Sequence, residues 1–192
     1  MNILILVFNS ILLGIGLAMD AFSVSLANGL NETKMQKNRM IEIASVFGVF
    51  QTIMPLTGWF LVHFLVEKFK VFEQFIPWIA LVLLTYIGSK MLTDGIRNKA
   101  EDEKTALGFK ELVIQGIATS IDALSVGFTI ANYSMKNAFI STIIIGVVTF
   151  IISFFGIILG KKFGTKLSNK ASILGGIILI AIGLEIFITG VF

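Results

Sequence analysis

The chain has 192 residues, of which 56% are hydrophobic and 14% are charged, and its mean hydropathy is +0.92. Soluble domains carry about 45–50% apolar and about 25% charged residues, so this composition argues against a soluble enzyme. The sequence has no cysteine and one histidine, which excludes disulfides, thiolate metal sites and His-rich zinc or copper sites. The formal charge of +3 is small and gives no indication of a nucleic-acid partner.

Six apolar stretches are long enough to cross a bilayer as a helix, which takes roughly 20 residues. In chain order they cover residues 3–30, 41–66, 75–92, 112–133, 138–159 and 171–192. The polar segments between them are short, and none is large enough to form a separate domain. The sequence therefore predicts an all-α membrane protein with six transmembrane helices.

The two halves of the chain contain a related segment. Residues 14–24 (GIGLAMDAFSV) align without a gap with residues 116–126 (GIATSIDALSV), and six of the eleven positions are identical. Composition alone can align alanines and valines, but it does not readily place Asp-x-x-Ser inside two hydrophobic spans. Weaker matches relate Gly48 to Gly146 and Gly58 to Gly156.

Three spans per half require the halves to enter the membrane in opposite directions. The sequence thus predicts two inverted-topology three-helix repeats, an architecture typical of secondary transporters. The first repeat covers residues 1–95 and the second covers residues 112–192. Residues 96–111 form a charged cytoplasmic linker between them.

The distribution of Lys and Arg predicts the orientation in the membrane. Eleven of these residues fall in the first, third and fifth connecting segments, whereas three fall in the second and fourth. Because basic residues accumulate on the cytoplasmic side, we expect both termini to face outside.

The strongest functional candidates are Asp20 and Asp122, which lie inside hydrophobic spans at equivalent positions of the repeat. An aspartate at the centre of a transmembrane helix costs roughly 2.5–3.5 kcal/mol on insertion scales, so it indicates function. No basic residue is near either of them in sequence, which favours a cationic substrate as the counter-charge. The alternative is a protonated aspartate that bonds to a neighbouring helix.

Polar residues around the two aspartates offer further oxygen atoms. Carboxylates together with hydroxyls and amides suit a hard cation such as Mg²⁺, Ca²⁺ or Mn²⁺. The alternative for the hydroxyls is a hydrogen bond to their own helix backbone. The candidate ligands besides the aspartates are Ser23, Ser125, Gln51, Thr119 and Asn28.

Glycine and proline near these positions have two interpretations. Gly14, Gly16, Gly116 and Gly127 could mark local unwinding that frees backbone carbonyls, or a close crossing of helices. Pro55 is expected to kink the second span and to release a carbonyl near the same depth.

Three other ionisable residues have weaker interpretations. Lys90, at the cytoplasmic end of the third span, fits a lysine that extends to the membrane interface. Glu185 lies deeper in the sixth span and could carry a proton or act in gating. His63 fits an interfacial residue near the outer end of the second span.

Three segments resemble the signature segments of the MntP-type manganese efflux pumps, which belong to the lysine-exporter superfamily. They are residues 17–27 (LAMDAFSVSLA), 47–59 (FGVFQTIMPLTGW) and 118–127 (ATSIDALSVG). The resemblance implies export of Mn²⁺, as the transported substrate, from the cytoplasm across a bacterial plasma membrane. It also implies that Asp20 and Asp122 are functionally required. Some members that resemble this chain carry Glu at the position of Gln51.

The sequence therefore predicts a secondary transporter that holds Mn²⁺ between two intramembrane aspartates, with proton antiport as a plausible coupling. An exporter of a small organic cation or amino acid and a non-transporting membrane assembly factor remain alternatives. No HExxH, GxSxG or Ser/His/Asp arrangement occurs, so we do not expect an enzyme. The expected partners are the divalent metal ion and the lipid bilayer, and the sequence leaves the oligomeric state open.

Overall fold

The computed structural model describes residues 3–64, 108–167 and 170–191, together with scattered residues between 78 and 96. The described part of the chain is helical and contains no strand, as predicted. Most of the third predicted span and of the charged linker lie outside the described residues, as do Lys90 and the side chains of His63 and Glu185.

Two long helices come first, and they match the first two predicted spans. α1 covers Ile3–Asn31, and α2 covers Lys37–Phe64 and begins four residues before the second predicted span. In the second half, α5 covers Phe109–Ala118, α6 covers Ala123–Thr129, α7 covers Met135–Leu167 and α8 covers Lys170–Val191. α5 and α6, with the break between them, occupy the fourth predicted span, where the sequence left local unwinding open.

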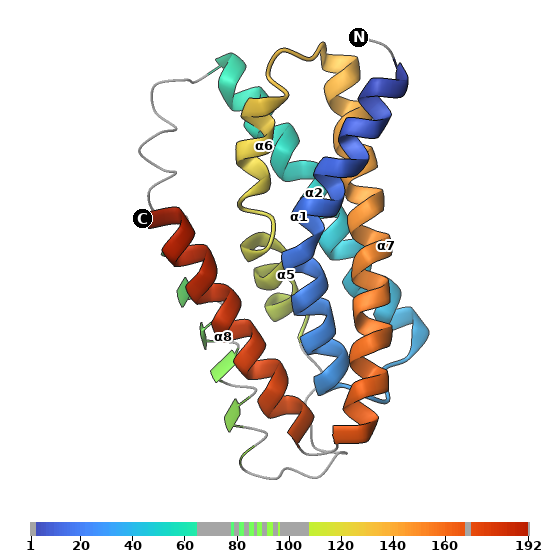
Figure 1. Cartoon of the computed structure of the whole chain (residues 1–192), viewed down its shortest axis with the longest axis vertical. Coiled ribbons are helices and arrows are strands. Elements are labelled where there is room, and N and C mark those ends of the chain that lie inside the picture. Colours follow the sequence, from blue (N-terminus) through green and yellow to red (C-terminus); the bar gives the residue numbers. More distant parts are fainter. Residues whose placement is uncertain are drawn as a thin grey trace.

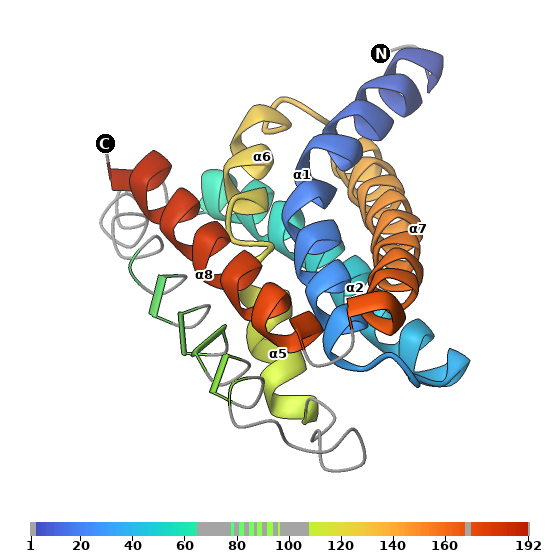
Figure 2. The same ribbon diagram turned by 60° about the horizontal axis from the view of Figure 1, so that its bottom comes forward.

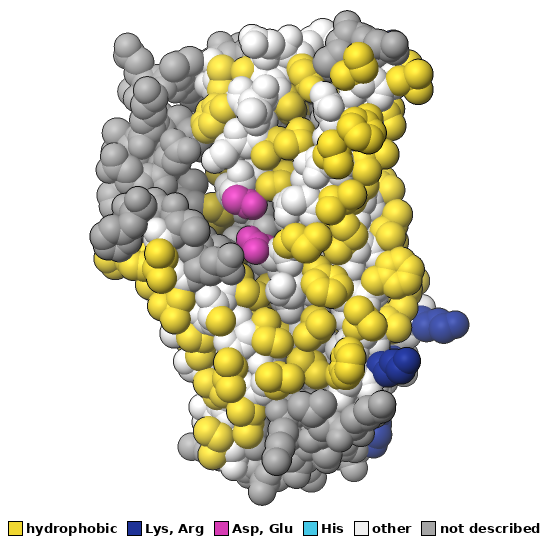
Figure 3. All heavy atoms as spheres, viewed as in Figure 1, with side chains coloured by type: hydrophobic (Ala, Val, Ile, Leu, Met, Phe, Trp, Pro, Cys, Tyr) yellow, Lys and Arg dark blue, Asp and Glu magenta, His cyan; other side chains and the backbone are white. Residues whose placement is uncertain are grey.

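Among the residues that the structure describes, four segments are long and apolar enough to cross a membrane. They are Ile3–Asn31, Lys37–Val62, Phe109–Thr129 and Met135–Phe163. Their outward faces carry large apolar side chains, such as Phe8 in α1 and Phe155 in α7. Figure 3 shows such side chains covering much of the face over α1 and α7. Water would oppose this exposure, whereas lipid accommodates it, so the chain is a multi-pass membrane protein.

The helices pack around α1. This helix runs beside α7 in both ribbon views and contacts α8 on another side (Figures 1 and 2). α2 contacts both α7 and α6. In Figure 1, α1 and α7 run down the page, whereas α2, α5, α6 and α8 run up it. The N-terminal helix of each half thus runs in the opposite direction to its counterpart.

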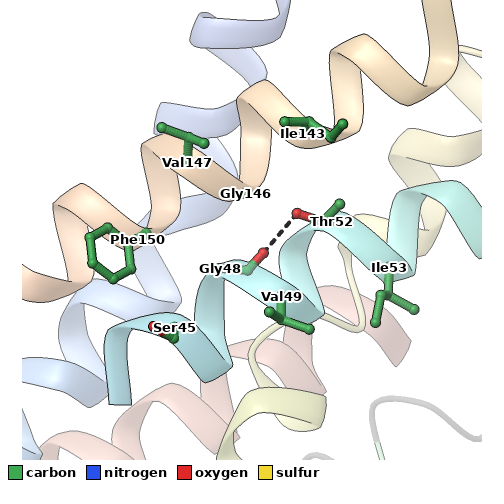
Figure 4. A pocket seen from close by; sticks show the side chains of 9 residues that line it. All are labelled: Ser45, Gly48, Val49, Thr52, Ile53, Ile143, Gly146, Val147 and Phe150. Carbon is green, nitrogen blue, oxygen red and sulfur yellow. Dashed lines mark hydrogen bonds between the residues drawn. The ribbon is translucent and has the colours of Figure 1, made fainter. Parts of the chain in front are cut away.

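Small residues allow the close contacts between these helices. At the crossing of α2 and α7, a methyl group on Gly48 would lie 2.8 Å from the carbonyl oxygen of Gly146, and one on Gly146 would lie 2.6 Å from the carbonyl oxygen of Gly48. Figure 4 shows this crossing beside an open groove, where Thr52 donates a hydrogen bond to the carbonyl of Gly48 (2.9 Å). The two helices therefore meet backbone to backbone.

A polar cluster ties the segment after α1 to the lower part of α7. Lys161 Nζ donates a hydrogen bond of 2.5 Å to the carbonyl oxygen of Met35, and Arg39 forms an ion pair with Glu42 (2.7 Å). Burial raises the pKa of Glu32 above its ordinary value of 4.5, and the positive charges of Arg39 and Lys161 offset this only in part.

Candidate metal-binding site

The centre of the candidate site is the break between α5 and α6. α5 ends at Ala118, and residues 119–122 form turns before α6 begins at Ala123. At Ser120 the hydroxyl takes the place of the backbone N–H, since Oγ donates to Gly116 O (2.7 Å) while the N–H donates to Ile117 O (3.1 Å). Thr119 Oγ1 donates to Gln115 O (2.9 Å), which the N–H of Thr119 also contacts. Such side-chain bonds offer the backbone an alternative to the helix.

Gly116 fits the interpretation as a close contact between helices, because it lies against the Phe50 ring of α2. The chain leaves the helix at Thr119, three residues later, and residues 119–122 contain no glycine. The equivalent segment of α1 stays helical, because α1 is continuous from Ile3 to Asn31. Unwinding thus occurs beside the second aspartate only.

The structure brings Asp20 and Asp122 together. Asp20 projects from the middle of α1 and is partly exposed, whereas Asp122 lies at the last position of the break and is exposed. The two carboxylates are close enough for their negative charges to repel each other. Figure 3 shows acidic side chains side by side about halfway along the molecule, in a recess with apolar side chains above and below. A divalent cation between them would remove this repulsion.

Gln51 links α2 to both of these helices and is completely buried. Its Nε2 donates to the carbonyl oxygen of Leu17 (2.8 Å) and makes a longer contact with that of Thr119 (3.5 Å). Each of these carbonyls comes three residues before an aspartate. Because both neighbours are acceptors, the amide presents its nitrogen to them, and Oε1 is left without a partner.

Pro55 adds a second oxygen at this level of α2. It lies inside the helix and has no N–H group, so the carbonyl of Gln51 lacks its usual donor four residues later. The sequence predicts this release of a carbonyl. Gln51 therefore has a side-chain oxygen without a partner and a backbone oxygen that lacks its usual helix donor.

The three candidate ligands with a hydroxyl group differ in their surroundings. Ser23 Oγ donates to Met19 O (3.0 Å), and Thr119 Oγ1 donates to its own helix, so only the lone pairs of these two oxygens remain for a cation. Ser125 is exposed on α6, one turn after Asp122. These three side chains lie within one turn of an aspartate.

Asn28 is not brought to the aspartates. It follows Asp20 by eight residues, about 12 Å along the helix axis. Its amide is fully engaged with Gln115, since Asn28 Nδ2 donates to Gln115 Oε1 (2.8 Å) and Gln115 Nε2 donates to Asn28 Oδ1 (3.2 Å). Sequence reasoning missed Gln115, although a glutamine within a hydrophobic span was a usable signal.

In the part of the chain that the structure describes, no three His, Cys, Asp or Glu residues gather at one point. A metal at this site would have two carboxylates and would take its other ligands from neutral oxygens. Such a donor set suits Mn²⁺, Mg²⁺ or Ca²⁺ better than zinc or copper, which prefer nitrogen and sulfur.

Ionisable side chains inside membrane spans mark ion and substrate pathways, so a multi-pass helical membrane protein with two such carboxylates has the features of a transporter. Comparison with known proteins identifies the family to which the chain belongs. The family model described as "Putative manganese efflux pump" matches residues 32–187, and the chain belongs to this family.

Relatives cover nearly the whole chain. A protein of Clostridium botulinum named "Putative manganese efflux pump MntP 2" is 44% identical, over 93% of this chain and 92% of its own. One from Ruminiclostridium cellulolyticum is 42% identical over 95% of both chains, and one from Clostridium perfringens is 37% identical over 95% of this chain and 94% of its own. Both of these are named "Putative manganese efflux pump MntP". No solved structure matches the chain.

Proposed function

We propose that this protein exports Mn²⁺ from the cytoplasm as a secondary transporter and holds the ion between Asp20 and Asp122. One observation carries the proposal: two carboxylates from different halves of the chain meet inside spans that are otherwise apolar. Two carboxylates balance the charge of one divalent ion, which lowers the cost of holding it at low dielectric. The names of the relatives favour manganese as that ion.

The remaining ligands are neutral oxygens. Gln51 Oε1 is the best supported of them, because it is buried, has no partner and belongs to an amide anchored beside both aspartates. Ser23, Ser125 and Thr119 lie at the margin and contribute directly or through water. Asn28 has a structural role, because its amide pairs with Gln115.

The inverted repeat completes the proposal, with repeats at residues 1–95 and 112–192 joined by the linker 96–111. Equivalent positions make equivalent contacts, which supports it. Gly58 lies against the carbonyl oxygen of Leu124, and a methyl on Gly156 would lie 2.8 Å from that of Phe22. The repeat alignment pairs Gly58 with Gly156 and Phe22 with Leu124, so a pseudo-two-fold axis would pass near the contact of Gly48 with Gly146.

Transport would proceed by rocking of the two repeats about this axis, with exposure of the aspartates to each side in turn. Both termini would face outside, and the polar cluster around Lys161 would lie on the cytoplasmic side. Protons that bind the carboxylates outside would displace the ion and return with the empty carrier. This would make the cycle a proton antiport.

Inverted membrane vesicles test the function, because export from a cell becomes uptake into such a vesicle. We expect vesicles that contain the chain to accumulate Mn²⁺ and to lose this uptake when a protonophore collapses the pH gradient. Vesicles with the Asp122→Asn variant at equal abundance are the matched control. Equal Mn²⁺ uptake in both preparations, or uptake of Zn²⁺ or Cu²⁺ but not Mn²⁺, would contradict the proposal.

A further inference from the structure

A pocket with both basic and apolar walls lies where three transmembrane segments have an end. Its volume is about 300 Å³, and its lining residues are Thr33, Met40, Ile158, Lys161 and Lys162. The segments that begin or end within a few residues of this lining are Ile3–Asn31, Lys37–Val62 and Met135–Phe163. The pocket therefore lies at the level where acyl chains give way to lipid head groups.

Positive charge is in excess around this pocket. Residues 32–42 contain three Lys or Arg and two Glu, and the adjoining end of α7 adds Lys161 and Lys162. One of the two acids, Glu42, forms an ion pair with Arg39 (2.7 Å). Figure 3 shows Lys and Arg side chains gathered along one edge of the lower half of the molecule. This excess favours a ligand with a net negative charge.

The fold holds the Lys161 ammonium in place. Nζ donates to the carbonyl oxygen of Met35 (2.5 Å) and lies 3.9 Å from Met40 Sδ. The backbone of the same residue packs on α1, where a methyl group on Gly29 would lie 3.0 Å from Lys161 N. An ammonium carries three N–H donors, and sulfur is a weak acceptor. Lys161 can therefore donate to a further acceptor in the pocket, such as a phosphate oxygen.

An apolar surface continues from the pocket along α7. Ile158 and Phe155 precede Lys162 by four and seven residues, so the three side chains share one face of the helix. All three are exposed. The lysine is near the end of a span and the other two lie deeper within it. This arrangement suits a molecule with an anionic head and an apolar tail.

We propose that the pocket binds an anionic phospholipid, with its phosphate on Lys161 and Lys162 and an acyl chain along Ile158 and Phe155. Basic pockets between transmembrane helices recognise acidic lipid head groups in this way. The site is separate from the aspartates, because Gly29, which packs on Lys161, follows Asp20 by nine residues or about 14 Å of helix axis. In the proposed orientation it faces the cytoplasmic leaflet.

Native mass spectrometry of the full chain in detergent tests the proposal, by titration with phosphatidylglycerol and with phosphatidylethanolamine of the same acyl chains. We expect tighter binding of the first phosphatidylglycerol than of phosphatidylethanolamine. Lys162→Gln should weaken phosphatidylglycerol binding about fivefold, and Lys162→Arg should not. The matched control is Lys136→Gln, which removes an exposed lysine from the other end of α7 and should leave binding unchanged.

Ile158→Ala tests the acyl-chain contact. It removes apolar surface and no charge, so it should weaken binding of both lipids by a similar factor of about three. It also provides a second variant if Lys162→Gln does not fold. Equal affinity of the parent for the two lipids, or equal losses in Lys162→Gln and Lys136→Gln, would overturn the proposal. Displacement of the lipid by an equal concentration of glycerol phosphate would show a site for a free phosphate and would also overturn it.

Discussion

Replacement of Asp20 by asparagine is the most direct test of the carboxylate pair. Asp20→Asn keeps the shape of the side chain and removes its charge, so a bound divalent ion would face a single carboxylate. Breaking a fully buried ion pair costs about 3–5 kcal/mol. Because Asp20 is partly exposed and Asp122 is exposed, the pair is not fully buried, and the lower end of the range applies.

A loss of about 3 kcal/mol corresponds to roughly a hundredfold weaker Mn²⁺ binding, since each 1.4 kcal/mol is a factor of ten. Thermal unfolding gives an independent assay. In the parent, Mn²⁺ at a hundred times its Kd should stabilise the fold by about 2.7 kcal/mol, and most of this should vanish in the variant. Without metal, Asp20→Asn should be at least as stable as the parent, because the repulsion between the two carboxylates is gone.

Asp122→Asn should behave in the same way, and the double variant should be little worse than either single one, because the two residues act on one ion. Glu42→Gln is the matched control, since Glu42 is an acid of α2 paired with Arg39 away from the site. Parental Mn²⁺ affinity in Asp20→Asn, or fully additive losses in the double variant, would refute the shared-ion reasoning.

Three further outcomes are expected. A cysteine introduced at position 2 should react with an impermeant thiol reagent from outside the cell, and one at position 104 should not; the reverse pattern would contradict the proposed orientation. Gln115→Leu leaves the buried amide of Asn28 unpaired, and a denaturant titration should show the free energy of unfolding lowered by about 1–3 kcal/mol. The double variant Asn28→Leu, Gln115→Leu should recover much of that loss. Because burial raises the pKa of Glu32, its ionisation opposes folding, so the stability of the parent should fall as pH rises from below 4.5 through the raised pKa. Glu32→Gln should lack this fall in thermal unfolding midpoints, and an identical pH profile in the two proteins would count against the assignment.

Hydropathy predicted the helical membrane class, and a shared Asp-x-x-Ser pattern singled out the two aspartates. Both features can be recognised from short stretches of the sequence. The break at residues 119–122 was left open, because hydropathy does not register where a helix loses its backbone hydrogen bonds. At Ser120 the N–H donates to the carbonyl of Ile117 and the hydroxyl to that of Gly116, a pattern that depends on the fold.

The roles of the polar residues also depend on contacts between distant parts of the chain, which the sequence does not show. Asn28 was expected to ligate because it follows Asp20 on the same helix, but its partner Gln115 is 87 residues away. Gln51 was chosen by residue type, and its anchor on the carbonyl of Leu17 depends on the packing of two helices.

Because of the break between α5 and α6, one of the two aspartates can change position more easily than the other. Asp20 is carried by 29 residues of continuous helix, so it moves only if a long rigid rod moves. Asp122 is carried by a turn of four residues, in which a few backbone rotations shift the carboxylate without displacing a helix. An ion held between them would contact one carboxylate on a rigid helix and one on a deformable turn. Discrimination by ionic radius would then depend on Asp20, while Asp122 would set the rate at which the ion dissociates.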